Sequence, residues 1–151
     1  MDHCFPLATS VTTTSASQII YSQSFTSGTT PTSQCTAWTS FVAQLTASSY
    51  TSLTISGSLD PVGITLTDPN IISNIASALR TSTAYGPATS NGYSWMVGSC
   101  GNGYELSASG SICSCPTASY IVRPCMSNSN YGGVNSNTCS GPSQTMTVIF
   151  Q

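Results

Sequence analysis

Charge is almost absent from this sequence. Its 151 residues include no lysine, two arginines, four acidic residues and one histidine, so charged residues make up 4 % of the chain. In an ordinary soluble domain that fraction is about a quarter. Two arginines cannot neutralise a run of phosphates, which excludes a nucleic-acid-binding surface. Because charge normally keeps folded proteins hydrated and apart, other groups must hydrate this surface, or other material must cover it.

The chain also has few of the residues that common catalytic devices require. Its one histidine, His3, lies near the N-terminus, whereas a Ser-His-Asp triad needs a histidine that an acid holds rigidly. Paired carboxylates for glycoside hydrolysis would have to come from Asp60, Asp68 and Glu105. Asp68 is better explained as a helix cap and Asp60 as part of a turn, which leaves Glu105 to pair with an arginine. The sequence therefore predicts a protein that is not an enzyme.

The sequence also lacks the usual patterns of metal sites, cofactor sites and membrane spans. Cys113 and Cys115 are closer together than the cysteines of the usual zinc chelate. The acids are too few for an EF-hand-type calcium loop, and the glycines of residues 98–103 lack the lysine and the strand–helix context of a phosphate-binding loop. No apolar run approaches the ~20 residues of a membrane helix. We expect no metal, no cofactor and no membrane insertion.

Hydroxyl-bearing residues take the place of charge. Serine and threonine make up roughly a third of the chain. No Asn-x-Ser/Thr sequon is present, so we expect any glycan to be O-linked, on Ser/Thr-rich segments such as those in residues 1–33. Ice binding would need a regular threonine array, and the two tripeptides Thr65-Leu66-Thr67 and Thr145-Met146-Thr147 are isolated from each other in the sequence.

Seven cysteines indicate an oxidising, extracellular compartment and a disulfide framework. Six in pairs leave one over, and sequence cannot choose among their connectivities. Cys4 is the candidate for the odd cysteine and for a bond to another copy of the chain; alternatively, it pairs with Cys35 or with a C-terminal cysteine. The six cysteines that we expect in disulfides within the chain are Cys35, Cys100, Cys113, Cys115, Cys125 and Cys139.

Hydrophobic periodicity predicts two helices. The second spans residues 69–80, where Asp68 is a good N-cap and Pro69 suits the first helical position. The first spans residues 34–46, where one apolar side combines Trp38, Phe41, Val42 and Leu45.

Alternating apolar residues predict strands in the rest of the chain. The closing strand runs from Gln144 to Phe150, and a turn is expected at Gly57–Pro61. Two helices among several strands predict an α+β domain with a mainly antiparallel, disulfide-stabilised sheet over residues 34–151. Further strands are expected at residues 50–56, 64–67, 93–97 and 120–123.

Residues 1–33 form a separate Ser/Thr-rich N-terminal arm in this interpretation. Such an arm can add a strand to the sheet edge of a neighbouring copy, low charge removes repulsion between copies, and Cys4 can lock the contact. These features predict a secreted, O-glycosylated structural protein that self-assembles into a fibre, coat or matrix, with copies of itself as its partners. The candidate assembly strand contains Ile19, Ile20, Tyr21 and Phe25.

Carbohydrate binding is the alternative hypothesis. Aromatic faces beside amide and hydroxyl groups suit sugars, and the loop between Cys125 and Cys139 offers both. This pattern favours a lectin-like or adhesion module that binds glycans, although the same residue types also make loops that bind nothing. The candidate glycan-binding residues are Asn128, Asn130, Tyr131, Asn135 and Asn137.

Overall fold

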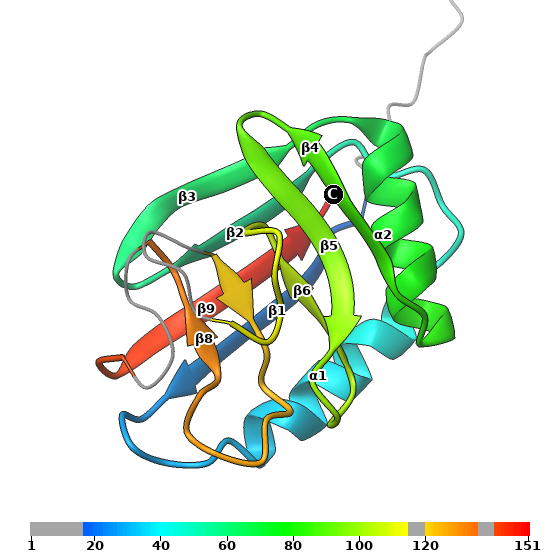
Figure 1. Ribbon diagram of the computed structural model, residues 1–151. Coiled ribbons are helices and arrows are strands. Elements are labelled where there is room, and N and C mark those ends of the chain that lie inside the picture. The colour runs from blue at the N-terminus through cyan, green and yellow to red at the C-terminus, as the bar shows by residue number, and fades with distance from the viewer. Residues whose placement is uncertain (1–16, 115–119, 136–140) are drawn as a thin grey trace, which may run out of the picture.

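A computed structural model describes residues 17–114, 120–135 and 141–151. Within them, two antiparallel sheets pack together and two helices lie along one side of the pair (Figure 1). The first sheet has the strand order β1-β9-β2-β3, and the second has the order β4-β5-β6-β7-β8. This α+β, mostly sheet arrangement, with two disulfides among the described residues, confirms the predicted fold class.

The C-terminal strand β9 (Gln144–Phe150) organises the first sheet. It pairs antiparallel with β1 (Ile19–Phe25) on one side and with β2 (Leu53–Gly57) on the other. β3 (Asp60–Leu66) then adds antiparallel to the free side of β2. Segments from the beginning, the middle and the end of the chain therefore meet in one sheet.

Burial alternates along these strands, as the pleat of a half-buried sheet requires. On β2, Leu53 and Ile55 are fully buried, while Thr54 and Ser56 are half-buried on the opposite face. The sheet therefore has an apolar inner face and a hydroxyl-rich outer face. On β9 the positions that point inward are Gln144, Met146, Val148 and Phe150.

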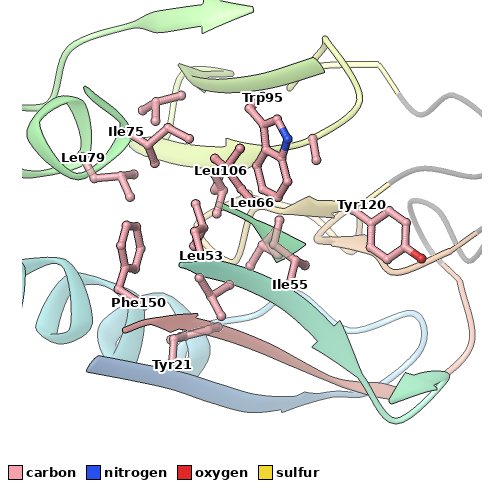
Figure 2. Packing of buried hydrophobic residues seen from close by; sticks show 14 of the residues in the cluster. Tyr21, Leu53, Ile55, Leu66, Ile75, Leu79, Trp95, Leu106, Tyr120 and Phe150 are labelled. Atoms are coloured by element: carbon pink, nitrogen blue, oxygen red, sulfur yellow. The ribbon is translucent and has the colours of Figure 1, made fainter. Parts of the chain in front are cut away.

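The hydrophobic core lies between the two sheets (Figure 2). Trp95 and Leu106 of the second sheet point toward Leu53 and Phe150 of the first, and Ile75 closes the core from the second helix. Each of these five side chains is fully buried. Burying one such side chain contributes about 1.5–3 kcal/mol, so this core is the main source of stability.

The second sheet is built from a hairpin and three shorter strands. The hairpin turn is Asn91-Gly92, whose φ angles are 55° and 77°. An Asn-Gly turn with two positive φ angles matches the twist of the flanking strands and is preferred in two-residue hairpins. The strands are β4 (Tyr85–Ser90), β5 (Tyr93–Ser99), β6 (Tyr104–Ser107), β7 (Ile121–Val122) and β8 (Gly132–Gly133).

Both helices begin close to where the sequence predicts them. α2 (Pro69–Thr81) packs against β4 and β5, and the Asp68 carboxylate accepts hydrogen bonds from the backbone N–H groups of Asn70 and Ile71. α1 (Ser33–Gln44) packs against β1 and buries Trp38 and Phe41. No helix in the described part of the chain is long and apolar enough to cross a bilayer.

The structure differs from the sequence prediction around Asp60 and in the polar strands. The turn between β2 and β3 is only Ser58-Leu59, so Asp60 and Pro61 lie within β3. The Asp60 carboxylate accepts hydrogen bonds from the Tyr120 hydroxyl and from the Gly63 N–H. β4, β6 and the two-residue β8 were not predicted, because none of them has a clear alternation of apolar and polar residues.

The strand-like segment of the N-terminal arm is β1, and it pairs with β9 of its own chain. Tyr21 and Phe25 are each 2 % exposed and belong to the core, whereas Ile20 on the outer face is 50 % exposed. The structure thus places β1 at the edge of the domain's own first sheet. Residues 1–16, including Cys4, lie outside the described residues.

Candidate functional site

Among the described residues, no strand pairs with the outer side of β1, which is an edge of the first sheet. Gln151 and Ser52 exchange backbone hydrogen bonds of 3.0 and 3.1 Å, so β9 directs the groups of Gln151 toward β2. Backbone groups alternate between the two sides of a strand. The backbone N–H and C=O groups of Phe150 therefore point toward β1, where Ile19 is its partner. The backbone groups of every second residue of β1 then point away from β9. The residues whose N–H and C=O groups point outward are Ile20, Ser22 and Ser24.

One side chain among the described residues bonds to this edge. The Gln34 amide on α1 donates its Nε2–H to the Ser24 carbonyl at 2.6 Å, which independently shows that Ser24 points outward. The Tyr21 hydroxyl in turn donates to the Gln34 carbonyl at 3.1 Å. In the described part of the chain, the outward groups of Ile20 and Ser22 have no hydrogen-bond partner.

The sequence of β1 carries none of the usual protection of an edge strand. Native edges are blunted by lysine or other charges, by proline, by bulges or by being very short. The β1 sequence IIYSQSF is seven residues long and contains no charge and no proline. Its pairing with β9 runs without a register shift from Ile19 to Phe25. β1 is therefore a ready template for another strand.

The other three sheet edges do carry such protection. β3 contains Pro61, and its pairing with β2 has a register shift. The Asn91 amide also donates to the outward carbonyl of Thr65 at 3.0 Å, as the Gln34 amide does to the Ser24 carbonyl on β1. β4 contains Pro87 and also has a register shift. β8 has only two residues. The covering role of Asn91 has no signal in the sequence beyond its turn motif.

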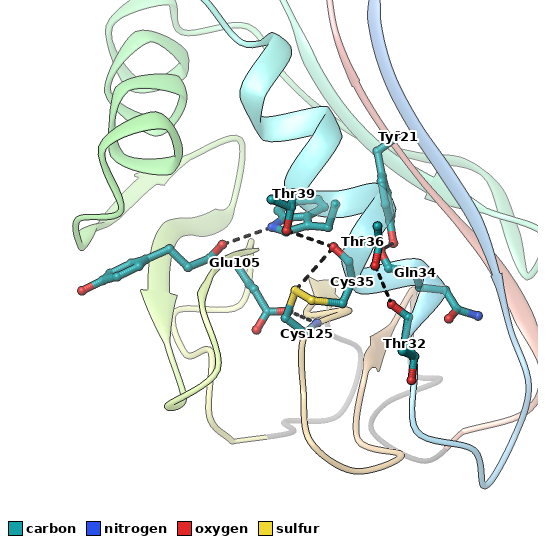
Figure 3. The surroundings of a disulfide bond; sticks show 10 residues. Tyr21, Thr32, Gln34, Cys35, Thr36, Thr39, Glu105 and Cys125 are labelled. Carbon is teal, nitrogen blue, oxygen red and sulfur yellow. Dashed lines mark hydrogen bonds between the residues drawn. A yellow bond between two sulfur atoms is a disulfide. The ribbon is translucent and has the colours of Figure 1, made fainter.

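Two disulfides join distant parts of the described chain. Cys35 in the first turn of α1 is bonded to Cys125, 90 residues later, and this bond ties α1 to the segment after β7 (Figure 3). Cys100 is bonded to Cys113. These four of the six predicted cysteines are confirmed as disulfide partners. Cys115 and Cys139 lie outside the described residues.

Glu105 is buried beside the Cys35–Cys125 bond (Figure 3). Its Oε2 accepts a hydrogen bond from the Cys125 N–H at 2.9 Å, while its Oε1 has no hydrogen-bond partner. Burial raises the pKa of Glu105 to about 8, although the Cys125 N–H and the charge of Arg123 act in the opposite direction. The carboxyl is therefore largely protonated at neutral pH.

A groove flanks the same disulfide. It has a volume of about 570 Å³ and is lined by uncharged residues of α1, of the loop before it and of the segment around Cys125. A second hollow of about 200 Å³ lies between α1, Leu79 of α2 and Tyr104 of β6. Neither hollow is lined by an acid, a histidine or a lysine.

The carbohydrate hypothesis depended on an exposed aromatic ring in the loop after Cys125. Tyr131 is fully buried, and its ring packs against Phe25 at a centroid distance of 4.7 Å. It cannot stack on a sugar in this arrangement. Asn128, Ser129 and Asn130 lie at the surface, and the Asn128 side chain accepts a hydrogen bond from the Asn130 N–H.

The last two candidate glycan-binding residues are placed differently. Asn135 is exposed and has a φ of 44°, a conformation that asparagine tolerates in turns. Asn137 lies outside the described residues. The structure therefore does not bring an exposed aromatic ring and the loop asparagines together.

The other two acids among the described residues, Asp60 and Asp68, have structural partners. The Tyr120 hydroxyl and the Gly63 N–H lower the pKa of Asp60 by bonding to its carboxylate, and Asp68 caps α2. Among the described residues, no group of three or more histidine, cysteine or acidic side chains is placed to hold a metal ion. Comparison with protein-family models, curated proteins and solved structures finds no match to this chain.

The two disulfides are expected to contribute differently to stability, because they close loops of different length. In the chain-entropy description a bond that closes a longer loop stabilises more, about 4.5 kcal/mol for a 90-residue separation and about 3 kcal/mol for 13 residues. Replacing Cys35 and Cys125 by serine should therefore lower the unfolding free energy more than replacing Cys100 and Cys113. Denaturant unfolding of both double variants measures this, and the reverse order would contradict it.

Burial of Glu105 predicts an unusual pH dependence. The pKa of this carboxyl is 4.5 when unfolded and about 8 when folded, so the folded state holds its proton more tightly. Stability is then highest below pH 4.5 and falls as the pH rises to about 8, by up to about 1.4 kcal/mol per pH unit. The chain has one histidine and no lysine, so little else titrates in this window.

Thermal unfolding of the native protein and of Glu105→Gln between pH 4 and pH 9 tests this assignment. We expect the melting temperature of the native protein to fall across the window and that of the variant to stay nearly constant. An equal decline in both proteins would assign the pH dependence to another group.

Proposed function

We propose that this protein is an extracellular structural protein that assembles with copies of itself, and that the open edge of β1 is its principal contact. The observation that carries the proposal is the contrast among the four sheet edges. Three edges carry proline, a register shift or a very short strand, and among the described strands only β1 forms an edge with none of these. Protection against edge pairing is thus weakest at one of the four described edges.

Pairing of two β1 edges has a defined geometry. Two copies related by a two-fold axis join their first sheets into one continuous antiparallel sheet of eight strands. The outward N–H and C=O groups of Ile20 and Ser22 find partners in the other copy, and the Ile20 side chains of the two copies come close together. Unpaired backbone groups supply the affinity in this kind of strand addition.

A second contact is needed to extend such a dimer into a fibre, because a two-fold contact closes on itself. The turn between β2 and β3 and the start of β3 expose Leu59 (41 %) and Val62 (86 %), which together with Ile20 are the large apolar side chains exposed among the described residues. Leu59 lies in the turn between β2 and β3 and Val62 lies on β3, at the opposite edge of the first sheet from β1. Alternating contacts at opposite edges generate a linear array.

The low charge supports the same proposal. Among the described residues, β1 and its neighbour β9 carry no charged side chain, so copies approach without electrostatic repulsion. The disulfides are consistent with an oxidising compartment outside the cell. O-glycans on the Ser/Thr-rich N-terminal residues would keep the assembled surface hydrated.

Substitutions at Ser22 test the edge contact. Ser22→Pro removes an outward N–H without breaking a bond to β9, and proline is tolerated on an edge strand. Ser22→Ala removes the hydroxyl but keeps the N–H, so it is the matched control. We expect light scattering of unreduced protein to show large particles for the native chain and for Ser22→Ala, and small ones for Ser22→Pro.

The thermal stability of both variants is measured beside their size. Ser22→Pro should remain folded, because the bonds between β1 and β9 come from the alternate residues. A folded Ser22→Pro that assembles as well as the native chain would refute the edge contact, and a native chain that is monomeric at high concentration would refute self-assembly.

A further inference from the structure

The outer face of the first sheet carries an ordered array of hydroxyl groups. Each of four adjacent strands contributes a tripeptide with serine or threonine at both ends: β1 with Ser22 and Ser24, β9 with Thr145 and Thr147, β2 with Thr54 and Ser56, and β3 with Thr65 followed by Thr67. The tripeptides that are isolated in the sequence therefore become neighbours in the sheet. We call this surface the hydroxyl face, defined as Ser22, Ser24, Thr54, Ser56, Thr65, Thr145 and Thr147.

The strand register sets these hydroxyl groups in rows. Ser22 lies opposite Thr147, and Thr147 lies opposite Ser56, so one row crosses three strands. Ser24 lies opposite Thr145 in the next row. Neighbouring strands are about 4.8 Å apart, and every second residue along a strand is about 6.8 Å further on. The hydroxyl face is thus a two-dimensional grid that follows the twist of the sheet.

Hydrogen bonds between the side chains hold the grid in place. The Ser22 and Thr147 hydroxyls are 3.0 Å apart, and those of Ser24 and Thr145 are 3.1 Å apart. At the β2–β3 pair, the Thr54 and Thr65 hydroxyls are 2.9 Å apart. Each such bond uses one donor and one acceptor, and the other lone pairs of each hydroxyl stay free to bond outward. The hydroxyl groups are therefore already ordered before any ligand binds, which lowers the entropy cost of binding.

The chemistry of this face fits a lattice of water molecules. A hydroxyl donates one bond and accepts two, so it resembles a water molecule more closely than any charged side chain does. The threonine methyl groups and the apolar Ile20 and Ile149 in the adjoining row restrict the orientation of first-shell water. None of the seven hydroxyl-face residues is charged, so no ion imposes a different hydration geometry.

We propose that the hydroxyl face binds ice. A crystalline polysaccharide is a less suitable occupant, because sugar rings are recognised by aromatic faces and the hydroxyl face contains no aromatic residue. The face needs only one copy of the chain, and its side chains point out of the sheet plane rather than along the β1 edge. Ice binding is consequently independent of the self-assembly proposed above.

The experiment uses the full, unreduced chain and ice itself as the probe. Protein is partitioned between a slowly growing ice front and the remaining solution, and recrystallisation of fine-grained ice is followed in parallel. Thr147→Lys places a long, charged side chain at the centre of the grid, between Ser22 and Ser56. Thr65→Lys places the same side chain on the edge strand β3, and edge strands tolerate lysine well. Ser73→Lys, at an exposed position of α2, is the matched control.

We expect the native chain and Ser73→Lys to enter the ice and to slow recrystallisation, and both hydroxyl-face variants to lose these properties while their melting temperatures show that they are folded. Exclusion of the native chain from ice would overturn the proposal. Entry of folded Thr65→Lys or Thr147→Lys at the native level would also overturn it, because ice would then contact another surface.

Discussion

The first sheet depends on the placement of β9 between β1 and β2. β9 is the last strand of the chain, yet it supplies hydrogen bonds to strands near residue 20 and residue 55. Its inward side chains lie at the centre of the core, and its outward threonines lie at the centre of the hydroxyl face. Within this sheet only the β2–β3 hairpin is local, whereas the pairings of β9 join residues far apart in the sequence and therefore form slowly. Burial of the whole inner face stabilises the sheet and offsets the entropy cost of these long-range pairings.

The same placement leaves β1 at the edge with one side unpaired. A chain with ordinary charge would protect such an edge with lysine, but this chain has no lysine and puts no charge on β1. The low charge and the open edge are therefore two aspects of one property: little on this side of the molecule prevents two copies from meeting. Proline and register shifts at β3 and β4 direct that meeting to β1.

Local signals in the sequence predict those elements whose cause is local. The Asp68-Pro69 pair specifies the start of α2, and strict alternation specifies β9 with the bounds Gln144 and Phe150. β4 and β6 escape prediction because their polar residues become strands only through pairing with β5. The burial of Tyr131 and the unpaired Oε1 of Glu105 likewise follow from tertiary packing. Edge position is a property of strand order, which no local pattern encodes.

Amide hydrogen exchange at β1 tests the central claim most directly. In dilute protein, the outward N–H groups of Ile20, Ser22 and Ser24 should exchange quickly, while those of Tyr21 and Gln23, bonded to β9, should exchange slowly. In concentrated, assembled protein all five should exchange slowly, because a second copy then pairs with the edge. Fast exchange of the outward groups in the assembled protein, or slow exchange already in the monomer, would contradict this account.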